Sequence, residues 1–297
     1  MIYTITTNPS LDYYLCFDKE ISSVENNRST KEFFDAGGKG VNVSIFLNSL
    51  GIQSACLGFL GGFTKDFYLS YLKKFRNIQP LFTNIDDNSR INIKALGPNN
   101  VSLNALGPHI SDEEYNKFIA RASKIYDDDY IVLSGSIQPE LHDKLIQLVG
   151  SLTSGGTRVI LDTDLDLTDK CLTYNPYCVK LNSENTGVNE EEIVAKGKDL
   201  ISKGAACVLY SSPINKNYYF IYDAGVYKCT RDKDIKALTG SGDAMIAGFL
   251  FSRIRGANPK EAFKYAVASS MNLTLSDEVL DRDVIENEVN RLEVTDL

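Results

Sequence analysis

Short apolar runs of strand length alternate with helical stretches from one end of this sequence to the other. Such alternation is typical of a mostly parallel sheet with helices on both faces, because crossover helices join parallel neighbours. The predicted strands are 2–6, 54–59, 130–134, 157–161, 177–181 and 206–210. The predicted helices are 39–50, 64–75, 111–125, 138–150, 189–203, 241–255, 259–272 and 282–291. No linker, low-complexity tract or internal repeat divides the sequence, so we expect one three-layer α/β/α domain over 1–297.

Two pairs of extended runs interrupt the alternation. The four runs are 12–18, 29–35, 89–95 and 101–104. They are rich in β-branched and aromatic residues, and the two members of each pair lie too close together for a crossover helix. We expect a small antiparallel sheet drawn from about 12–35 and 89–104. Because open α/β sheets bind ligands at their strand ends, this small sheet is a candidate lid that excludes water.

The charge of the chain limits its partners. Its 39 acidic and 31 basic residues leave a net charge of −8, which is wrong for a protein that binds nucleic acid. Hydrophobic residues make up 43% of the 297 positions, enough to fill a large core. We expect small-molecule partners, and any anionic ligand must be held by cations or backbone amides placed close to it.

The cysteines and the N-terminal sequence indicate the compartment. The 6 cysteines are scattered, without a Cys-x-x-Cys pair or a histidine cluster, which predicts reduced thiols rather than disulfides or a zinc site. No basic region followed by an apolar run opens the sequence, and no segment approaches the ~18 apolar residues of a membrane span. We therefore expect a cytoplasmic protein that does not bind membranes.

The most informative motif is a glycine-rich turn, Leu238-Thr239-Gly240-Ser241-Gly242-Asp243, that leads directly into an amphipathic helix. Glycines at 240 and 242 permit a tight turn, and the free amides of the first helical turn can converge on a phosphate. Asp243 has two interpretations. It can cap the helix, or it can face the same pocket as the amides and accept the proton of an attacking hydroxyl, without needing a raised pKa.

A second glycine turn, Gly37-Gly38-Lys39-Gly40, opens the helix predicted at 39–50. Paired glycines allow a ligand to approach the backbone closely, and the lysine adds a positive charge to the same cavity. The spacing of a Walker A loop is absent. Taken alone, this motif is equally well explained as an ordinary turn.

Six motifs follow one another along the chain. They are Thr7-Asn8-Pro9-Ser10-Leu11-Asp12, Gly37-Gly38-Lys39-Gly40 with Asn42, Gly58-Phe59-Leu60-Gly61-Gly62, Ser89-Arg90-Ile91-Asn92, Ser134-Gly135-Ser136 and Gly240-Ser241-Gly242-Asp243. In this order they resemble the PfkB (ribokinase-like) sugar kinases over essentially the whole chain, most closely the branch containing 1-phosphofructokinase and tagatose-6-phosphate kinase. The resemblance implies a ribokinase-like fold. It also implies phosphoryl transfer from ATP, with Mg²⁺, to the free primary hydroxyl of fructose 1-phosphate or tagatose 6-phosphate.

The resemblance also implies roles for individual residues. Asp243 matches the catalytic base, and Gly240, Ser241 and Gly242 match the anion hole. The substrate-binding matches are Asp12, Gly38, Lys39, Asn42, Arg28, Arg90 and Ser136. The nucleotide-binding matches are Lys180, Asn182, Ser212, Gly240 and Gly242, and no metal-ligating residue is assigned. Lid faces often pair in this family, so a homodimer through the lid is implied as well.

The choice of a phosphorylated sugar rests on three cations. Arg28, Lys39 and Arg90 match positions that receive the existing phosphate of the substrate. A planar guanidinium can grip a phosphate with two hydrogen bonds, which outweighs the diffuse field of an acidic protein. Apart from the resemblance, each arginine is also explained as a solvated surface charge, Asp12 as a turn residue and Asn42 as an exposed helical residue.

Two stretches depart from the family pattern on the nucleotide side. Where the family has Asn-x-x-Glu, this chain has Asn182-Ser183-Glu184-Asn185, so the glutamate is displaced by one position. In 210–217 both glycines of the loop that approaches the nucleotide are replaced. A side chain in place of glycine blocks close backbone approach. A second hypothesis is therefore a phosphosugar-binding sensor with a degenerate nucleotide site.

Overall fold

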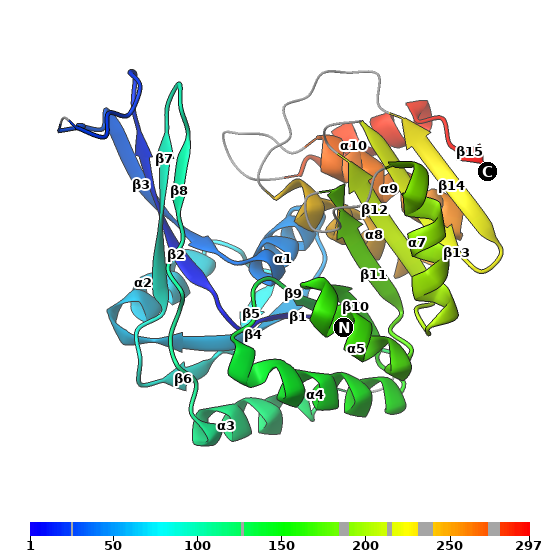
Figure 1. Ribbon diagram of the computed structural model, residues 1–297, viewed down its shortest axis with the longest axis horizontal. Coiled ribbons are helices and arrows are strands. Elements are labelled where there is room, and N and C mark those ends of the chain that lie inside the picture. Colours follow the sequence, from blue (N-terminus) through cyan, green and yellow to red (C-terminus); the bar gives the residue numbers. More distant parts are fainter. Residues whose placement is uncertain (25, 126–127, 184–189, 213–215, 231–239, 273–279) are drawn as a thin grey trace.

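A large, mostly parallel sheet forms the body of the protein in the computed structural model, which describes residues 1–24, 26–125, 128–183, 190–212, 216–230, 240–272 and 280–297 (Figure 1). The strand order is β15-β14-β13-β12-β11-β10-β9-β1-β4-β5, with β6 paired to β4. The strands are β1 Ile2–Thr6, β4 Ser54–Gly61, β5 Ile78–Pro80, β6 Thr83–Ile85, β9 Tyr130–Ser134, β10 Arg158–Asp162, β11 Cys178–Asn182, β12 Cys207–Ser212, β13 Asn217–Tyr222, β14 Gly225–Thr230 and β15 Thr295–Asp296.

The six strands predicted from apolar runs are confirmed to within two residues, as β1, β4 and β9 to β12. They pair in parallel, with Ile2 opposite both Ser54 and Tyr130, so their carboxyl ends share one edge of the sheet. The antiparallel hairpin of β13 and β14 extends the sheet beyond β12 and was not predicted. A search for alternating strands and helices overlooks this hairpin because no helix separates its strands.

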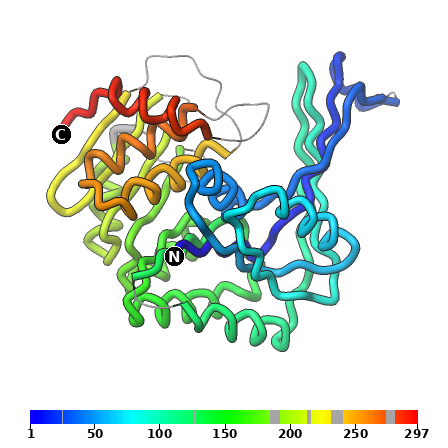
Figure 2. Tube along the Cα trace, turned by 180° about the vertical axis from the view of Figure 1, so that it is seen from behind, coloured from blue at the N-terminus to red at the C-terminus, as the bar shows by residue number. Residues whose placement is uncertain are grey.

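Helices cover both faces of the sheet, as the alternation predicts. They are α1 Lys39–Ser49, α2 Gly62–Leu72, α3 Asp112–Ala122, α4 His142–Ser154, α5 Leu165–Cys171, α7 Glu190–Ser202, α8 Ser241–Arg253, α9 Pro259–Met271 and α10 Arg282–Arg291. One core joins α1, α8, α9 and α10 to one face, and these helices lie in front in the reverse view (Figure 2). On the other face α3, α4 and α5 share a second core, and α7 contributes to a third. None of the described helices is long and apolar enough to cross a bilayer.

Helix boundaries follow the capping residues. A capping box of Ser111 and Glu114 starts α3, and the Asn258 side chain caps α9 just before Pro259. The helix predicted at 138–150 begins four residues later, at His142, because a short 3₁₀ turn occupies Pro139–Leu141. The short helix α5, capped by Asp164, was not predicted.

The lid consists of β2 Ser10–Cys16, β3 Lys31–Gly37, β7 Arg90–Leu96 and β8 Val101–Leu103. These strands project from the body near the carboxyl edge of the main sheet (Figures 1 and 2). Both predicted hairpins, β2 with β3 and β7 with β8, are antiparallel. A parallel pairing of β2 with β7 joins them into one sheet in the order β3-β2-β7-β8.

Candidate active site

A cavity of about 670 Å³ lies between the carboxyl edge of the main sheet, the start of α8 and the inner face of the lid. Its lining includes twelve residues expected from the sequence: Asp12, Gly38, Lys39, Asn42, Arg90, Ser136, Lys180, Asn182, Gly240, Ser241, Gly242 and Asp243. Segments more than 200 positions apart in the sequence therefore contribute to one site.

Asp243 lies in the first turn of α8 and faces this cavity. The N-cap of the helix is Gly240, with φ of 91°, a left-handed conformation that glycine adopts without strain. The Asp243 side chain is 4% exposed, and its Oδ2 accepts a hydrogen bond of 2.9 Å from Asn42 Nδ2. Of the two interpretations of Asp243, capping is therefore excluded by its position and its partner.

The environment of Asp243 raises the pKa of its carboxyl to about 7. Burial is the main cause, and the nearby Asp162 carboxylate adds to it. Lys39, the Asn42 hydrogen bond and Lys180 act in the opposite direction. General-base chemistry at this position does not require a raised pKa, but a carboxyl titrating near neutrality suits it.

Asp162, at the end of β10, is a cavity residue that the sequence reasoning missed. Its Oδ2 lies 3.2 Å from Lys39 Nζ, and its Oδ1 lies 4.0 Å from Lys180 Nζ. The side chain is buried, and in the described part of the chain neither oxygen accepts a hydrogen bond. An acidic residue at the carboxyl end of a buried parallel strand was the signal that could have found it.

Lys180, on β11, reaches the backbone at the start of α8. A Cβ placed on Gly242 would lie 2.6 Å from Lys180 Nζ, so glycine at this position leaves room for the ammonium beside the backbone. Asn182 and Ser211 line the same side of the cavity, whereas Ser212 is buried at the end of β12 outside the lining. The sequence departs from the family pattern in two stretches that lie partly outside the described residues. The positions not described are Glu184, Asn185 and 213–215.

The inner face of the lid supplies the opposite wall. Asp12 Oδ1 accepts hydrogen bonds from Ser10 Oγ at 2.6 Å and from Asn92 Nδ2 at 2.9 Å. Lys94 and Asn104 also line the cavity and had not been singled out from the sequence. Strand alternation places Arg90, Asn92 and Lys94 on the same face of β7, which was the available signal.

Arg90 links the lid to the body. Its Nε donates to the Asn8 carbonyl at 3.2 Å, Nη1 to the Ala105 carbonyl at 3.0 Å and Nη2 to Ser136 Oγ at 3.3 Å. Burial lowers the pKa of this guanidinium, and the Asp12 charge opposes that effect. By contrast, Arg28 is exposed on the chain between β2 and β3 and is not among the residues that line the cavity.

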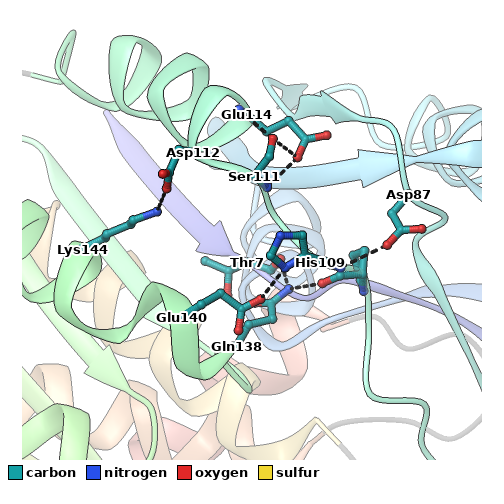
Figure 3. A network of polar contacts seen from close by, with 10 residues as sticks. Thr7, Asp87, His109, Ser111, Asp112, Glu114, Gln138, Glu140 and Lys144 are labelled. Atoms are coloured by element: carbon teal, nitrogen blue, oxygen red, sulfur yellow. Dashed lines mark hydrogen bonds and ion pairs between the residues drawn. The ribbon is translucent and has the colours of Figure 1, made fainter.

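A polar network joins the loops that follow β1, β8 and β9 (Figure 3). Gln138 Nε2 donates to the carbonyls of Thr7 and Pro108, at 3.4 and 3.5 Å, so three loops meet at one buried amide. His109 closes the network, with its backbone amide on Asp87 and its Nδ1 3.4 Å from Glu140. The network holds the loop that follows β9, and with it Ser136, against the segment that follows β8.

No group of three or more potential metal ligands occurs among the described residues. Asp162 has the chemistry that Mg²⁺ prefers, because it offers two buried carboxylate oxygens to the cavity. Mg²⁺ is commonly held by one or two carboxylates together with substrate phosphates and water. The residues present therefore fit a metal bound jointly with a nucleotide.

The model of the pfkB family carbohydrate kinases matches residues 9–279. The chain belongs to this family. The 1-phosphofructokinase of Bacillus subtilis (strain 168) is 30% identical over 305 residues and is covered, like this chain, over its full length. The D-tagatose-1-phosphate kinase of Bacillus licheniformis is 28% identical, again over 100% of both chains. Phosphofructokinase-2 of Escherichia coli, solved with substrates and products, has a TM-score of 0.90 at 21% identity over 98% of each chain, which shows the same fold.

Membership of the pfkB family makes the protein a sugar kinase and implies ATP as its co-substrate. The predicted family and branch are confirmed, and so is the predicted ribokinase-like fold. The tagatose kinase among these relatives is named for a 1-phosphate, whereas the sequence resemblance had pointed to tagatose-6-phosphate kinase.

Proposed function

We propose that this kinase transfers the terminal phosphoryl group of ATP to the free primary hydroxyl of a ketohexose phosphate, with Asp243 as the general base. The observation that supports this proposal most directly is the position of Asp243. Its carboxyl is buried at the head of α8, in the cavity that also contains Asp12 and Arg90. Fructose 1-phosphate and tagatose 6-phosphate are the candidate substrates from the sequence. The relatives' names add D-tagatose 1-phosphate.

Proton transfer and charge stabilisation fall to different groups in this proposal. Asp243 accepts the hydroxyl proton as the new bond to phosphorus forms. The amides of Gly240, Ser241 and Gly242, at the positive end of the α8 dipole, hold the transferring phosphoryl oxygens. Lys180, beside Gly242, supplies a further positive charge at that point. Mg²⁺, held by Asp162 and nucleotide phosphates, would neutralise phosphate charge.

The sugar is positioned by the lid. Asp12 has one carboxylate oxygen engaged by Ser10 and Asn92, which fixes its orientation toward the cavity. A carboxylate held in this way can accept hydrogen bonds from sugar hydroxyls. Asn42 bonds Asp243 from α1, so the substrate loop and the base are joined before any substrate arrives.

We also propose a homodimer formed through the outer face of the lid. Strand alternation places Leu11, Tyr13 and Phe34 on the face opposite Asp12, and Tyr13 and Phe34 stack with their ring centroids 4.2 Å apart. Phe34 is 38% exposed, and Leu103 on β8 is 58% exposed. Exposed apolar side chains on one face of a sheet are typical of a surface that binds another protein chain.

Coupled measurement of ADP release tests the function. Purified protein is supplied with ATP, Mg²⁺ and each of fructose 1-phosphate, D-tagatose 1-phosphate and tagatose 6-phosphate. At least one should be turned over, and Asp243→Asn should lower kcat by about 10²- to 10⁴-fold. Asp66→Asn, which changes an exposed acid of α2, is the matched control. Equal turnover by wild type and Asp243→Asn would remove Asp243 from the mechanism.

The sensor hypothesis has a separate signature. If the protein binds phosphosugars without catalysis, its melting temperature rises with a sugar phosphate but not with ATP and Mg²⁺. Stabilisation by both ligands is the result expected for the kinase.

A further inference from the structure

The phenol of Tyr68 lies at the junction between the lid and the body. Tyr68 is on α2, which packs against β3 at the base of the lid (Figure 1). Its hydroxyl donates a buried hydrogen bond of 2.9 Å to the carbonyl of Gly37, the last residue of β3. We propose that Tyr68 is a positioning residue for the sugar, because this bond fixes the peptide between Gly37 and Gly38 beside the substrate. The inference rests on the proposed function and deepens it, since it adds a residue that acts through the groups that contact the sugar.

The peptide between Gly37 and Gly38 has no side chain on either side to restrict it. Gly38, the N-cap of α1, has a φ of 131°, which residues with a Cβ rarely adopt. Two glycines in a row therefore leave the orientation of this peptide to its hydrogen bonds, and the phenol holds the carbonyl side. Because a trans peptide directs its carbonyl and its N–H to opposite sides, the Gly38 N–H points away from Tyr68. Gly38 lines the cavity, so a hydrogen bond inside the core sets the orientation of a peptide at the cavity surface.

Asp12 lies directly against Gly37. A Cβ placed on Gly37 would lie 2.6 Å from both Cγ and Oδ2 of Asp12 and 2.7 Å from Ser10 Oγ, so the space beside this backbone is already filled. The same Ser10 hydroxyl donates to Asp12 Oδ1 at 2.6 Å. The carboxylate proposed to bind sugar hydroxyls therefore rests on the backbone whose carbonyl Tyr68 holds. A displacement of Gly37 would displace this carboxylate as well, because close-packed neighbours move together.

Tyr68 is itself held in one place. Its side chain is fully buried in a core cluster with Val41 and Leu72, and its ring meets that of Phe82 edge to face, with centroids 5.7 Å apart. Burial raises the pKa of the hydroxyl well above its ordinary value, so the group remains a hydrogen-bond donor at every pH at which the enzyme is assayed. A side chain whose conformation is fixed by packing can hold its hydrogen-bond partner precisely.

The same face of α2 reaches a second strand of the lid. Thr64 lies four residues, about one turn, before Tyr68, and its hydroxyl is within hydrogen-bonding distance, 3.1 Å, of the Ser89 carbonyl. Ser89 directly precedes β7, and Gly37 ends β3, so one helix contacts the chain at the two strands that flank β2. Because β2 carries Asp12, α2 sets the place of this carboxylate relative to the body from both sides.

Tyr68→Phe tests this role, because it removes the hydroxyl and keeps the ring. Tyr115→Phe is the matched control: the Tyr115 hydroxyl, on α3, donates to the Lys144 carbonyl at 2.7 Å, and neither residue is among those that line the cavity. Each variant loses one hydrogen bond from a buried tyrosine to a backbone carbonyl, so each melting temperature should fall by about 2–4 °C. Steady-state kinetics are measured with fructose 1-phosphate and D-tagatose 1-phosphate, and separately with varied ATP.

Tyr68→Phe should raise KM for the sugar phosphate that is turned over by about 3- to 10-fold, because the groups that bind the sugar lose their fixed place. Its kcat and its KM for ATP should stay within about twofold of wild type. Tyr115→Phe should change none of these constants, despite its similar loss of stability. An unchanged KM for the sugar in Tyr68→Phe, or an equal rise in KM for sugar and for ATP, would overturn the inference.

A binding measurement separates this inference from the proposed function. If wild-type protein turns over neither sugar phosphate, the proposed kinase reaction fails, and thermal shift with fructose 1-phosphate and D-tagatose 1-phosphate still examines Tyr68. Stabilisation of wild type that is reduced in Tyr68→Phe and kept in Tyr115→Phe supports the positioning role. No stabilisation of wild type, or equal stabilisation of all three proteins, refutes it.

Discussion

Asn42 donates a hydrogen bond of 2.9 Å from Nδ2 to Oδ2 of Asp243, joining α1 to the head of α8 across 201 positions of sequence. The bond favours the charged form of a carboxyl whose pKa burial has raised to about 7. This hydrogen bond therefore keeps more of Asp243 in the carboxylate form, which can accept a proton, than burial alone would allow.

The pH dependence of activity should report this carboxyl. Protonated Asp243 cannot accept the hydroxyl proton, so kcat/KM of wild type should fall as pH drops below about 7. Asn42→Ala removes a hydrogen bond that lowers the pKa of Asp243. The acidic limb of the pH–rate profile of this variant should therefore move to higher pH, and its kcat/KM at pH 8 should be reduced about 10-fold. Asn84→Ala, whose exposed side chain accepts from Lys65, is the control. An acidic limb that stays in place in Asn42→Ala would contradict this assignment.

Asp243→Asn should stabilise the protein at alkaline pH while abolishing most activity. The folded pKa of about 7 lies above the unfolded value, so the folded state binds the extra proton between about pH 4 and pH 7. Wild type therefore loses stability as pH rises through this window, by up to about 4 kcal/mol, and the amide variant does not. Its melting temperature should exceed that of wild type at pH 8, with the difference shrinking toward pH 5. A variant less stable than wild type at pH 8 would argue against a buried, destabilised carboxylate.

The proposed dimer depends on the outer face of the lid. Phe34→Glu places a charge beside Tyr13 and Phe67, the two rings that contact Phe34. Light scattering with size-exclusion chromatography should give a dimer mass for wild type and a monomer mass for this variant. Val284→Glu, on α10, changes an apolar residue of similar exposure far along the chain and should remain dimeric. A wild type that is monomeric at micromolar concentration would exclude the lid interface.

The architecture was predictable because its central parallel strands are almost entirely buried and consist largely of apolar residues. The lid was also predictable from paired extended runs. Its central pairing was not, because the parallel register of β2 and β7, with Ser10 opposite Arg90, joins segments 80 positions apart. A pattern of residues within one segment of the sequence does not indicate which strands of two separate hairpins pair with each other.

The site was predictable where glycine turns carry a motif and less so elsewhere. Gly240, Gly242 and Asp243 could be singled out because two glycines open a helix there, but the catalytic role of Asp243 was implied only by the order of the six motifs. Asp162 and Lys94 were not assigned to a site from the sequence. Each is recognisable as a cavity residue only from its neighbours in space, Lys39 beside Asp162 and Asn104 beside Lys94. The resemblance implied the same role for Arg28 and Arg90, yet of these two arginines only Arg90 lines the cavity.

The parallel register between β2 and β7 fixes more than the shape of the lid. Seven aligned positions, from Ser10 with Arg90 to Cys16 with Leu96, place Asp12, Arg90 and Lys94 on one bonded plate. The hydrogen bonds of this register hold the backbone positions of the carboxylate and of the two cations at a fixed spacing. In the proposed function, the sugar therefore meets polar groups whose separation is set by the sheet and not by flexible loops.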